Sequence, residues 1–259
     1  MTDTSQQRWV LSPDEFAWVW TETGSDLHPD PISIVESPTT DDEYRLLTRE
    51  ISARYPRGGD TNLAEALCIL ADPELRIIGT GYSHQFPEKR LRVVAAAVGE
   101  SGAVAVQRSG PTVEAGGDIQ MLITTRSMLA RHVAAAMPPN TAGPAERMVG
   151  YTPRIRGDEP PSTYFRDSAG RAPIEERIRA FLRAPRAAEG HFTMATHASL
   201  GAPPTYLSWV DIREDRPAAG RYLIAVDDND TTVAPASRED IERYLTQLTG
   251  PDPVSRRAR

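Results

Sequence analysis

Residues 220–245 read GRYLIAVDDNDTTVAPASREDIERYL, and this stretch decides how the C-terminal part of the chain folds. Tyr222, Ile224 and Val226 alternate with other residues, as the side chains of a half-buried strand do. The acidic run that follows stands before a second strand-like segment, and its Asp-Asn pair tolerates the positive φ of a tight hairpin turn. The pattern therefore predicts a β-hairpin.

The same stretch predicts a closing helix after the hairpin. Ser237 and Asp240 stand three residues apart at its start, which is the spacing of a capping box. An apolar face follows at helical spacing and consists of Ile241, Tyr244, Leu245 and Leu248.

The acidic run also has the spacing of a calcium-binding loop. Oxygen-bearing side chains stand at alternate positions, and a glutamate stands at the twelfth position: Asp228, Asp230, Thr232 and Glu239. However, Val233 occupies the place where that loop needs glycine, and a strand precedes it instead of a helix. We interpret the run as a turn and predict no metal site.

The N-terminal region predicts three helices. The segment 12–24 carries Ser12 as N-cap, Glu15 to complete a capping box, and Gly24 as a stop. A short strand is expected at 32–37. The second helix begins after Thr40 with Glu43, and the third begins with a box of Asn62 and Glu65 and ends at Asp72 and Pro73.

The rest of the chain reads as two similar halves. In the first, strand patterns cover 75–83, 91–108 with a turn at 99–102, and 118–125, and a helix covers 126–138. In the second, a helix at 172–186 precedes strands within 191–199, 205–215, 220–226 and 231–237, and a helix at 238–250 closes it. Both halves run helix, strand, hairpin, strand, helix, so we infer a divergent duplication.

The two halves are expected to form one domain over residues 8–250. Half one covers 8–137 and half two covers 173–250, while 138–172 is rich in Pro, Gly and charge and predicts a mobile linker. Residues 251–259 predict a disordered tail. Such halves could form two sheets or one continuous antiparallel sheet, and periodicity leaves both alternatives open.

Composition excludes several classes of function. The 259 residues carry a net charge of -7, with 29 Lys and Arg against 36 Asp and Glu, so we expect no nucleic-acid partner. Because no apolar run approaches the roughly 18 residues of a spanning helix, we expect no membrane insertion and a cytoplasmic protein. The single cysteine, Cys68, is flanked by apolar residues and is expected to be a buried structural thiol.

Catalytic motifs are not found. The segment 79–84, GTGYSH, lacks the third glycine of a dinucleotide loop and continues into strand instead of opening a helix. The chain has no phosphate loop, zinc spacing or convincing triad, so we predict no enzyme, no catalytic residue and no cofactor.

Taken together, the pattern resembles the EspG family of chaperones associated with actinobacterial type VII (ESX) secretion. The resemblance rests on LSPDEFAWVWTETG, ALCILADPELRIIGTG, VVAAAVGESGAVAVQRSG and AGRYLIAV followed by TTVAPASREDIERYLTQL, in this order over about 8–250. It implies an α+β, pseudo-twofold duplicated fold, with a central antiparallel sheet flanked by helical bundles. It also implies a cytosolic chaperone that binds PE-PPE-type or WXG100-like helical substrates, keeps them soluble and gives specificity for one secretion machine.

Four residues are candidates for partner binding. His84 and Phe86 lie in the connector SHQFPEKR, and an exposed aromatic on a loop suits recognition. Tyr206 and Trp209 lie in one strand of the second half and could line a sheet face. Core packing is the alternative for Phe86 and Trp209, and a small-ligand or enzymatic module in the groove between the halves is the alternative function.

Overall fold

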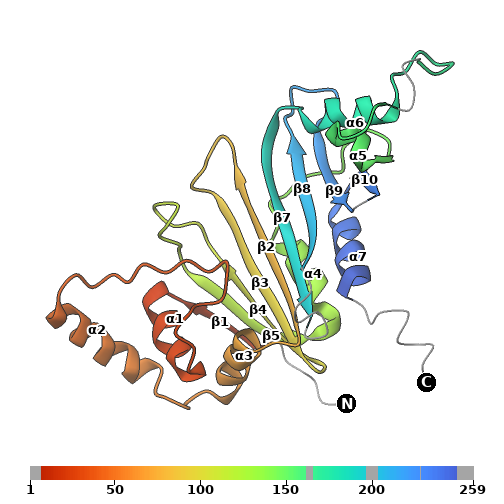
Figure 1. Ribbon diagram of the computed structural model, residues 1–259. Coiled ribbons are helices and arrows are strands. Elements are labelled where there is room, and N and C mark those ends of the chain that lie inside the picture. The colour runs from red at the N-terminus through yellow and green to blue at the C-terminus, as the bar shows by residue number, and fades with distance from the viewer. Residues whose placement is uncertain (1–6, 162–165, 197–203, 228, 250–259) are drawn as a thin grey trace, which may run out of the picture.

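The computed structural model describes residues 7–161, 166–196, 204–227 and 229–249. In these residues ten strands form one antiparallel sheet, in the order β1-β5-β4-β3-β2-β7-β8-β9-β10-β6 (Figure 1). The strands are β1 (Arg8–Leu11), β2 (Leu75–Ser83), β3 (Arg90–Val98), β4 (Ser101–Gln107), β5 (Ile119–Thr125), β6 (Met148–Tyr151), β7 (Arg186–Thr196), β8 (Thr205–Ile212), β9 (Gly220–Val226) and β10 (Asp230–Pro235).

The halves of the chain meet at the centre of this sheet. Strands β2 and β7 pair through nine residue pairs, from Leu75 with Thr196 to Ser83 with Ala188. The sheet is therefore continuous, which decides between the two alternatives that the sequence leaves open.

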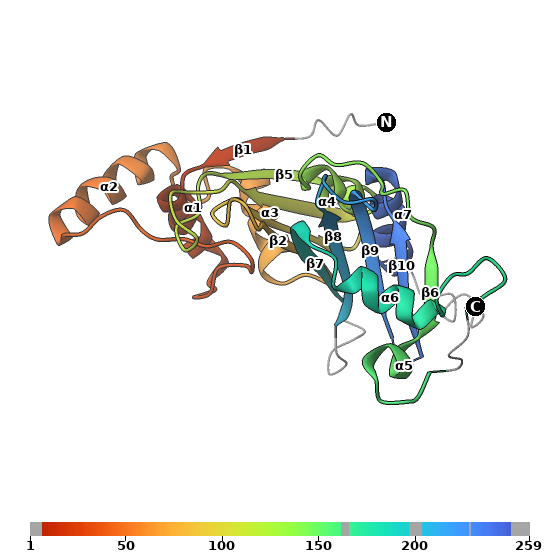
Figure 2. The ribbon, with the colours of Figure 1, turned by 90° about the horizontal axis from the view of Figure 1, so that it is seen from above.

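Helices cover both faces of the sheet. The α-helices are α1 (Pro13–Trp20), α2 (Asp41–Arg54), α3 (Thr61–Ala71), α4 (Leu129–Ala136), α5 (Thr152–Arg156), α6 (Ile174–Leu182) and α7 (Arg238–Thr249), with short 3₁₀ turns η1 (Thr21–Thr23) and η2 (Arg126–Met128). Helices α4 and α7 pack together on one face, over a core that includes Phe192 and Trp209. The other face carries α1 and α3 at one end of the sheet and α5 and α6 at the other (Figure 2).

The predicted caps of three helices are confirmed. Ser12 accepts a hydrogen bond from the N–H of Glu15 at 3.2 Å, and the Glu15 carboxylate accepts one from the N–H of Ser12 at 2.9 Å. Thr40 and Glu43 form the same box on α2. On α7, the N–H of Ser237 donates to the Asp240 carboxylate at 2.8 Å.

The predicted hairpin is confirmed, because β9 pairs with β10, but Asn229 does not adopt the positive φ expected of the Asp-Asn pair. The Asp227 carboxylate accepts the N–H of Asn229 at 2.8 Å and that of Asp230 at 2.6 Å. These backbone donors hold the pKa of Asp227 below its usual range. Asp227 therefore serves the hairpin, while Asp228 lies outside the described residues.

The predicted start of α3 is wrong. Asp60 is its N-cap and accepts hydrogen bonds from the N–H groups of Asn62 and Leu63, both at 3.1 Å. Asn62 lies inside the helix, where its amide donates to Gln7 instead of capping. An aspartate two residues earlier offers the same first-turn donors a charged acceptor, which makes the stronger bond.

The strand expected at 32–37 is also wrong, because this segment crosses a sheet face as a loop. Ile32 packs into the core beneath α1 and α3. The N–H of Ser33 donates to the Gln107 side chain at 2.9 Å, and the Gln107 amide donates back to the Ser33 carbonyl at 2.8 Å. A buried side chain thus satisfies backbone groups that a neighbouring strand would otherwise bond.

Two short edge strands are not predicted by the sequence pattern. β1 pairs with β5, and β6 pairs with β10, through four residue pairs each. β6 and α5 lie within 138–172, so part of the expected linker belongs to the sheet and its helical cover. The mobility of the rest stays a prediction, and the expected tail 251–259 lies outside the described residues.

Cys68 is exposed on α3, which corrects the expectation of a buried thiol. The apolar face of α3 consists instead of Leu63, Ala66, Leu67 and Leu70, with Ile69. Cys68 has apolar neighbours in sequence, but the helix turns it away from them.

Candidate functional site

On one face, no helix of the described residues covers the centre of the sheet. On this face Val94 of β3 lies under α3, and Val210 of β8 lies in the core formed with α6. Between these two helical groups, β2 and β7 lie open in front (Figure 1). His191 and Ala195 of β7 are exposed there, whereas Phe192 and Met194 are buried on the opposite face. We call this surface the central strip.

Strand register places the side chains of the central strip in rows. One row runs from Thr80 to His191 and Ser208, and the next runs from Ile78 to Thr193 and Tyr206. The Thr80 hydroxyl lies 3.3 Å from His191 Nε2, and the His191 and Tyr206 rings lie 6.4 Å apart between centroids. The strip thus carries mixed polar and aromatic groups.

Tyr206, one of the four predicted residues, is 58% exposed at the edge of this strip. Trp209, three residues later, is 1% exposed on the opposite face, where its indole N–H donates to the Thr80 carbonyl at 3.2 Å. An odd step along a strand changes the face, so the structure does not bring these two residues together. The position of Trp209 fits the core-packing alternative.

A polar cluster at one end of the strip positions His84. The Glu189 carboxylate accepts a hydrogen bond from the Tyr82 hydroxyl at 2.9 Å, lies 3.0 Å from His84 Nε2, and forms an ion pair with Arg186. Burial acts to raise the pKa of Glu189, but the hydrogen bonds from Tyr82 and Arg186 outweigh it and leave the pKa below its usual range. The cluster therefore links the base of the β2–β3 hairpin to β7.

Phe86 lies on that hairpin, in the loop between β2 and β3. It is 41% exposed, and the Lys89 ammonium lies 4.2 Å from its ring centroid. The N–H of His84 donates to the Ala187 carbonyl at 2.8 Å, which extends the β2–β7 pairing toward the loop. His84 and Phe86 thus lie at one end of the central strip, in the loop that follows β2.

Sequence reasoning missed the other members of this surface, among them Thr80, Glu189 and His191. Each is an ordinary residue of a strand, and only the antiparallel register of β2 with β7 brings them together. The alternation of the strands was the available signal, but it does not show which face the helices leave open.

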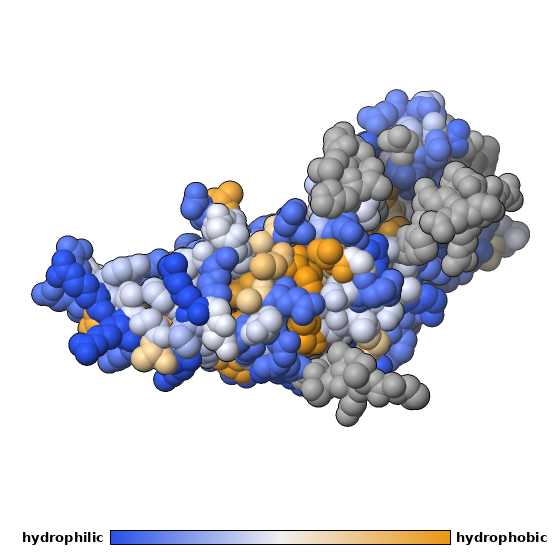
Figure 3. Space-filling model, turned by 90° about the horizontal axis from the view of Figure 1, so that it is seen from below, coloured by the Kyte–Doolittle hydropathy of each residue, from blue (hydrophilic) through white to orange (hydrophobic). Residues whose placement is uncertain are grey.

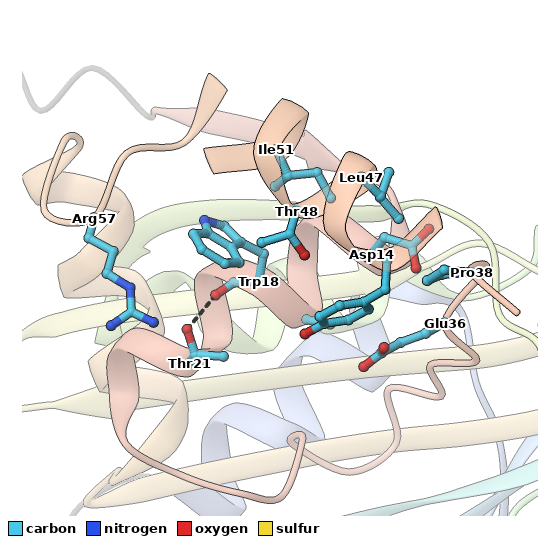
Figure 4. A pocket seen from close by; sticks show the side chains of 11 residues that line it. Asp14, Trp18, Thr21, Glu36, Pro38, Leu47, Thr48, Ile51 and Arg57 are labelled. Atoms are coloured by element: carbon cyan, nitrogen blue, oxygen red, sulfur yellow. Dashed lines mark hydrogen bonds between the residues drawn. The ribbon is translucent and has the colours of Figure 1, made fainter. Parts of the chain in front are cut away.

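A second hollow lies between α1 and α2 (Figure 4). Trp18, Tyr44 and Ile51 line it. The Arg57 guanidinium lies 5.6 Å from the Trp18 ring centroid, and the Thr21 hydroxyl donates to the Trp18 carbonyl at 2.7 Å. None of the four predicted residues lines it.

Exposed apolar groups are concentrated in the middle of the molecule (Figure 3). Seen from below, apolar side chains gather near the lower ends of the central strands, and α2 forms a hydrophilic end (Figure 3).

Within the described residues, no group of three or more His, Cys, Asp or Glu side chains is placed to hold a metal ion. None of the helices described is both long and apolar enough to cross a membrane.

Comparison with known proteins gives a consistent result. The model of the EspG family matches residues 12–247. Among solved structures, the fold is similar to that of the Mycobacterium tuberculosis type VII secretion system chaperone EspG5, solved in complex with a PE25-PPE41 dimer, with a TM-score of 0.59. The two sequences are 14% identical, and the similarity covers 95% of this chain and 98% of that chain. No curated protein sequence matches this chain.

Proposed function

This chain belongs to the EspG family, and from that premise we propose that it is a cytoplasmic chaperone for helical substrates of type VII secretion. It binds a PE-PPE-type heterodimer, or a WXG100-like substrate, keeps it soluble and gives it specificity for one secretion machine. The activity is one of binding, as expected from the absence of catalytic motifs in the sequence.

The central strip with the β2–β3 hairpin is the binding surface in this proposal. The observation that carries it is the gap in the helical cover of the described residues, where Tyr206 and His191 stand exposed on the sheet, with Phe86 exposed on the loop that follows β2. Exposed aromatic groups on a fixed scaffold bind partners at a small cost in conformational entropy. An apolar tip of a helical substrate aggregates unless another protein covers it, and such a surface can cover it.

We also propose that the fold arose by duplication. Its support is the similar order of elements in the two halves: an edge strand and a helix (β1 and α1, β6 and α5), a further helix (α3, α6), four strands in a meander, and a final helix (α4, α7). The first half has one additional helix, α2. The strand order is correspondingly symmetric about the β2–β7 pair. Half two then begins at β6, earlier than the sequence pattern indicates.

The proposal is tested by co-expressing the full chain with candidate heterodimers, followed by size-exclusion chromatography and calorimetric titration of a pair that co-elutes. The double variant Phe86→Ser with Tyr206→Ser should weaken binding at least tenfold, because two exposed aromatic contacts are lost. Tyr44→Ser is the matched control, since Tyr44 is 52% exposed on α2, outside the central strip.

Two results would contradict the proposal. If the folded protein co-elutes with none of the helical pairs encoded beside its gene, the chaperone function fails. If Tyr44→Ser weakens binding while the double variant does not, the binding surface lies at the α1–α2 hollow and not at the central strip.

A further inference from the structure

Two arginines of β3 stand together at the border of the central strip. Arg90 and Arg92 lie two residues apart, so their side chains point to the same face, and they pair in register with Tyr82 and Thr80. Both line a hollow of about 390 Å³ that also includes His191. The described residues that line it include no aspartate or glutamate.

The Arg92 guanidinium is buried, and one of its nitrogens donates no hydrogen bond to the described residues. It is only 8% exposed, and its Nη2 donates to the carbonyl of Val113. Its Nη1 has no hydrogen-bond partner among the described residues. Buried polar groups almost always have a hydrogen-bond partner, and a buried guanidinium with an unused donor lowers the stability of the fold. An acceptor from a bound molecule would remove this cost.

Arg90 presents a second unused donor beside the first. Its Nε is also buried without a hydrogen-bond partner in the described part of the chain, and its guanidinium lies 5.1 Å from the Tyr82 ring centroid. Burial lowers the pKa of Arg92, and the positive charge of Arg90 lowers it further. The hollow is therefore a site of concentrated positive charge in a chain whose net charge is -7.

Arg90 and Arg92 form no ion pair with a carboxylate of the described residues. Glu189 is engaged with Tyr82, His84 and Arg186. Glu114 acts on Arg92 through its charge, but within the described residues it forms no ion pair with either arginine.

We propose that Arg90 and Arg92 form a carboxylate-binding site that receives an aspartate or glutamate side chain of the secretion substrate. A carboxylate offers two acceptor oxygens, which match the forked donors of arginine and make short, charge-assisted hydrogen bonds. The site borders the central strip, so an acidic residue at the tip of the substrate reaches it while the tip covers Tyr206. The identity of this partner rests on the proposed function, but the anion chemistry of the site does not.

The first experiment tests the chemistry without a partner. The full chain, labelled in its arginine guanidinium groups, is titrated with sodium acetate at constant ionic strength and followed by NMR, with acetamide as the neutral probe. Acetate should cause saturable shifts at Arg90 and Arg92 and none at Arg213, which is exposed and already paired with Asp215. An absence of saturable shifts, or equal shifts with acetamide, would overturn the site.

The second experiment uses a heterodimer that co-elutes with the protein. Arg90→Gln and Arg92→Gln should each raise Kd tenfold or more, Arg92→Lys should give a smaller rise, and Arg213→Gln should leave Kd unchanged. Circular dichroism and thermal melting show whether each variant is folded, and Arg90→Gln carries the test if Arg92→Gln is not. Neutralising the acidic substrate residue that occupies the site should add nothing to the Arg90→Gln effect.

The two proposals can fail separately. If acetate binds and no heterodimer does, the carboxylate site stands and the chaperone proposal fails. If a heterodimer binds wild-type protein and both folded glutamine variants equally well, the chaperone proposal stands and the carboxylate site is overturned.

Discussion

Single residues on β8 show how a small step in sequence separates two roles. Tyr206 and Trp209 lie three positions apart and therefore point to opposite faces of the sheet. Trp209 packs under α4 and α7, while Tyr206 borders the gap in the helical cover. The alternation of the strand is readable from sequence, but the covered face is not, because helices distant in sequence supply the cover.

Replacing these two aromatic residues should therefore have different consequences for stability. Trp209→Ala should lower the free energy of unfolding by about 3–5 kcal/mol, since it leaves a cavity in the core. Tyr206→Ser should change it by no more than about 0.5 kcal/mol, because its side chain is mostly in solvent. Urea denaturation measures both, and equal effects would contradict the assignment of the two faces.

The position of Cys68 gives a second test at this scale. Because its thiol is exposed on α3, the folded protein should react with a maleimide or with Ellman's reagent without denaturant, to one thiol per chain. Cys68→Ser removes the signal and serves as the blank. A thiol that reacts only after unfolding would support the original expectation of burial.

At the scale of elements, helix caps are the feature that the sequence predicts best. The boxes at Ser12, Thr40 and Ser237 involve residues three positions apart, so local sequence holds all the groups concerned. The predicted start of α3 is wrong because its N-cap, Asp60, lies two residues before the Asn62–Glu65 pair that resembles a capping box. The edge strands β1 and β6 were missed because four residues are too few to show a period.

The cap of α7 should make stability depend on pH. The N–H of Ser237 holds the pKa of Asp240 below its usual range, and the bond from Arg243 adds to this effect. A carboxylate whose pKa is lowered by folding contributes stability above the pKa of the unfolded chain, and loses it as the pH falls through the folded-state pKa.

Asp240→Asn should therefore cost about 1 kcal/mol of unfolding free energy at pH 7, as expected for a lost cap interaction. The difference from wild type should shrink as the pH is lowered from 7 toward 2, because the unfolded chain and then the folded chain become protonated at Asp240. Urea denaturation at the two pH values checks this, with Glu242→Gln on the same helix as control. A difference that persists at low pH would mean that the charge of Asp240 is not responsible.

At the scale of the whole molecule, the β2–β7 pair joins the two halves into one sheet. The join requires close backbone approach at Gly190, where an added Cβ would lie 1.9 Å from the Thr80 carbonyl oxygen. Gly190 pairs in register with Gly81, so both strands carry glycine at this point. A side chain there would force the halves apart.

Gly190→Val should accordingly destabilise the protein by about 3 kcal/mol or more, at the upper end of the range for overpacking. Calorimetry should show one cooperative transition for wild type and a transition at markedly lower temperature for the variant. Thr193→Val, on the open face of the same strand, is the control and should have little effect. A wild-type melting temperature in Gly190→Val would mean that the central pairing is not tight.

The sequence by itself determined the strands β2–β5 and β8–β10, the C-terminal part of β7, and the starts of α1, α2 and α7, because these depend on periodicity and on groups a few residues apart. It extended the helix before β7 to residue 186, whereas α6 ends at Leu182 and β7 begins at Arg186. Only the tertiary structure decided that the two halves share one sheet, that Trp209 is buried while Tyr206 is not, and that Arg90 and Arg92 line one hollow whose described residues include no carboxylate. The physical reason is that burial and pairing across strands depend on contacts between residues far apart in the chain, which no local pattern records.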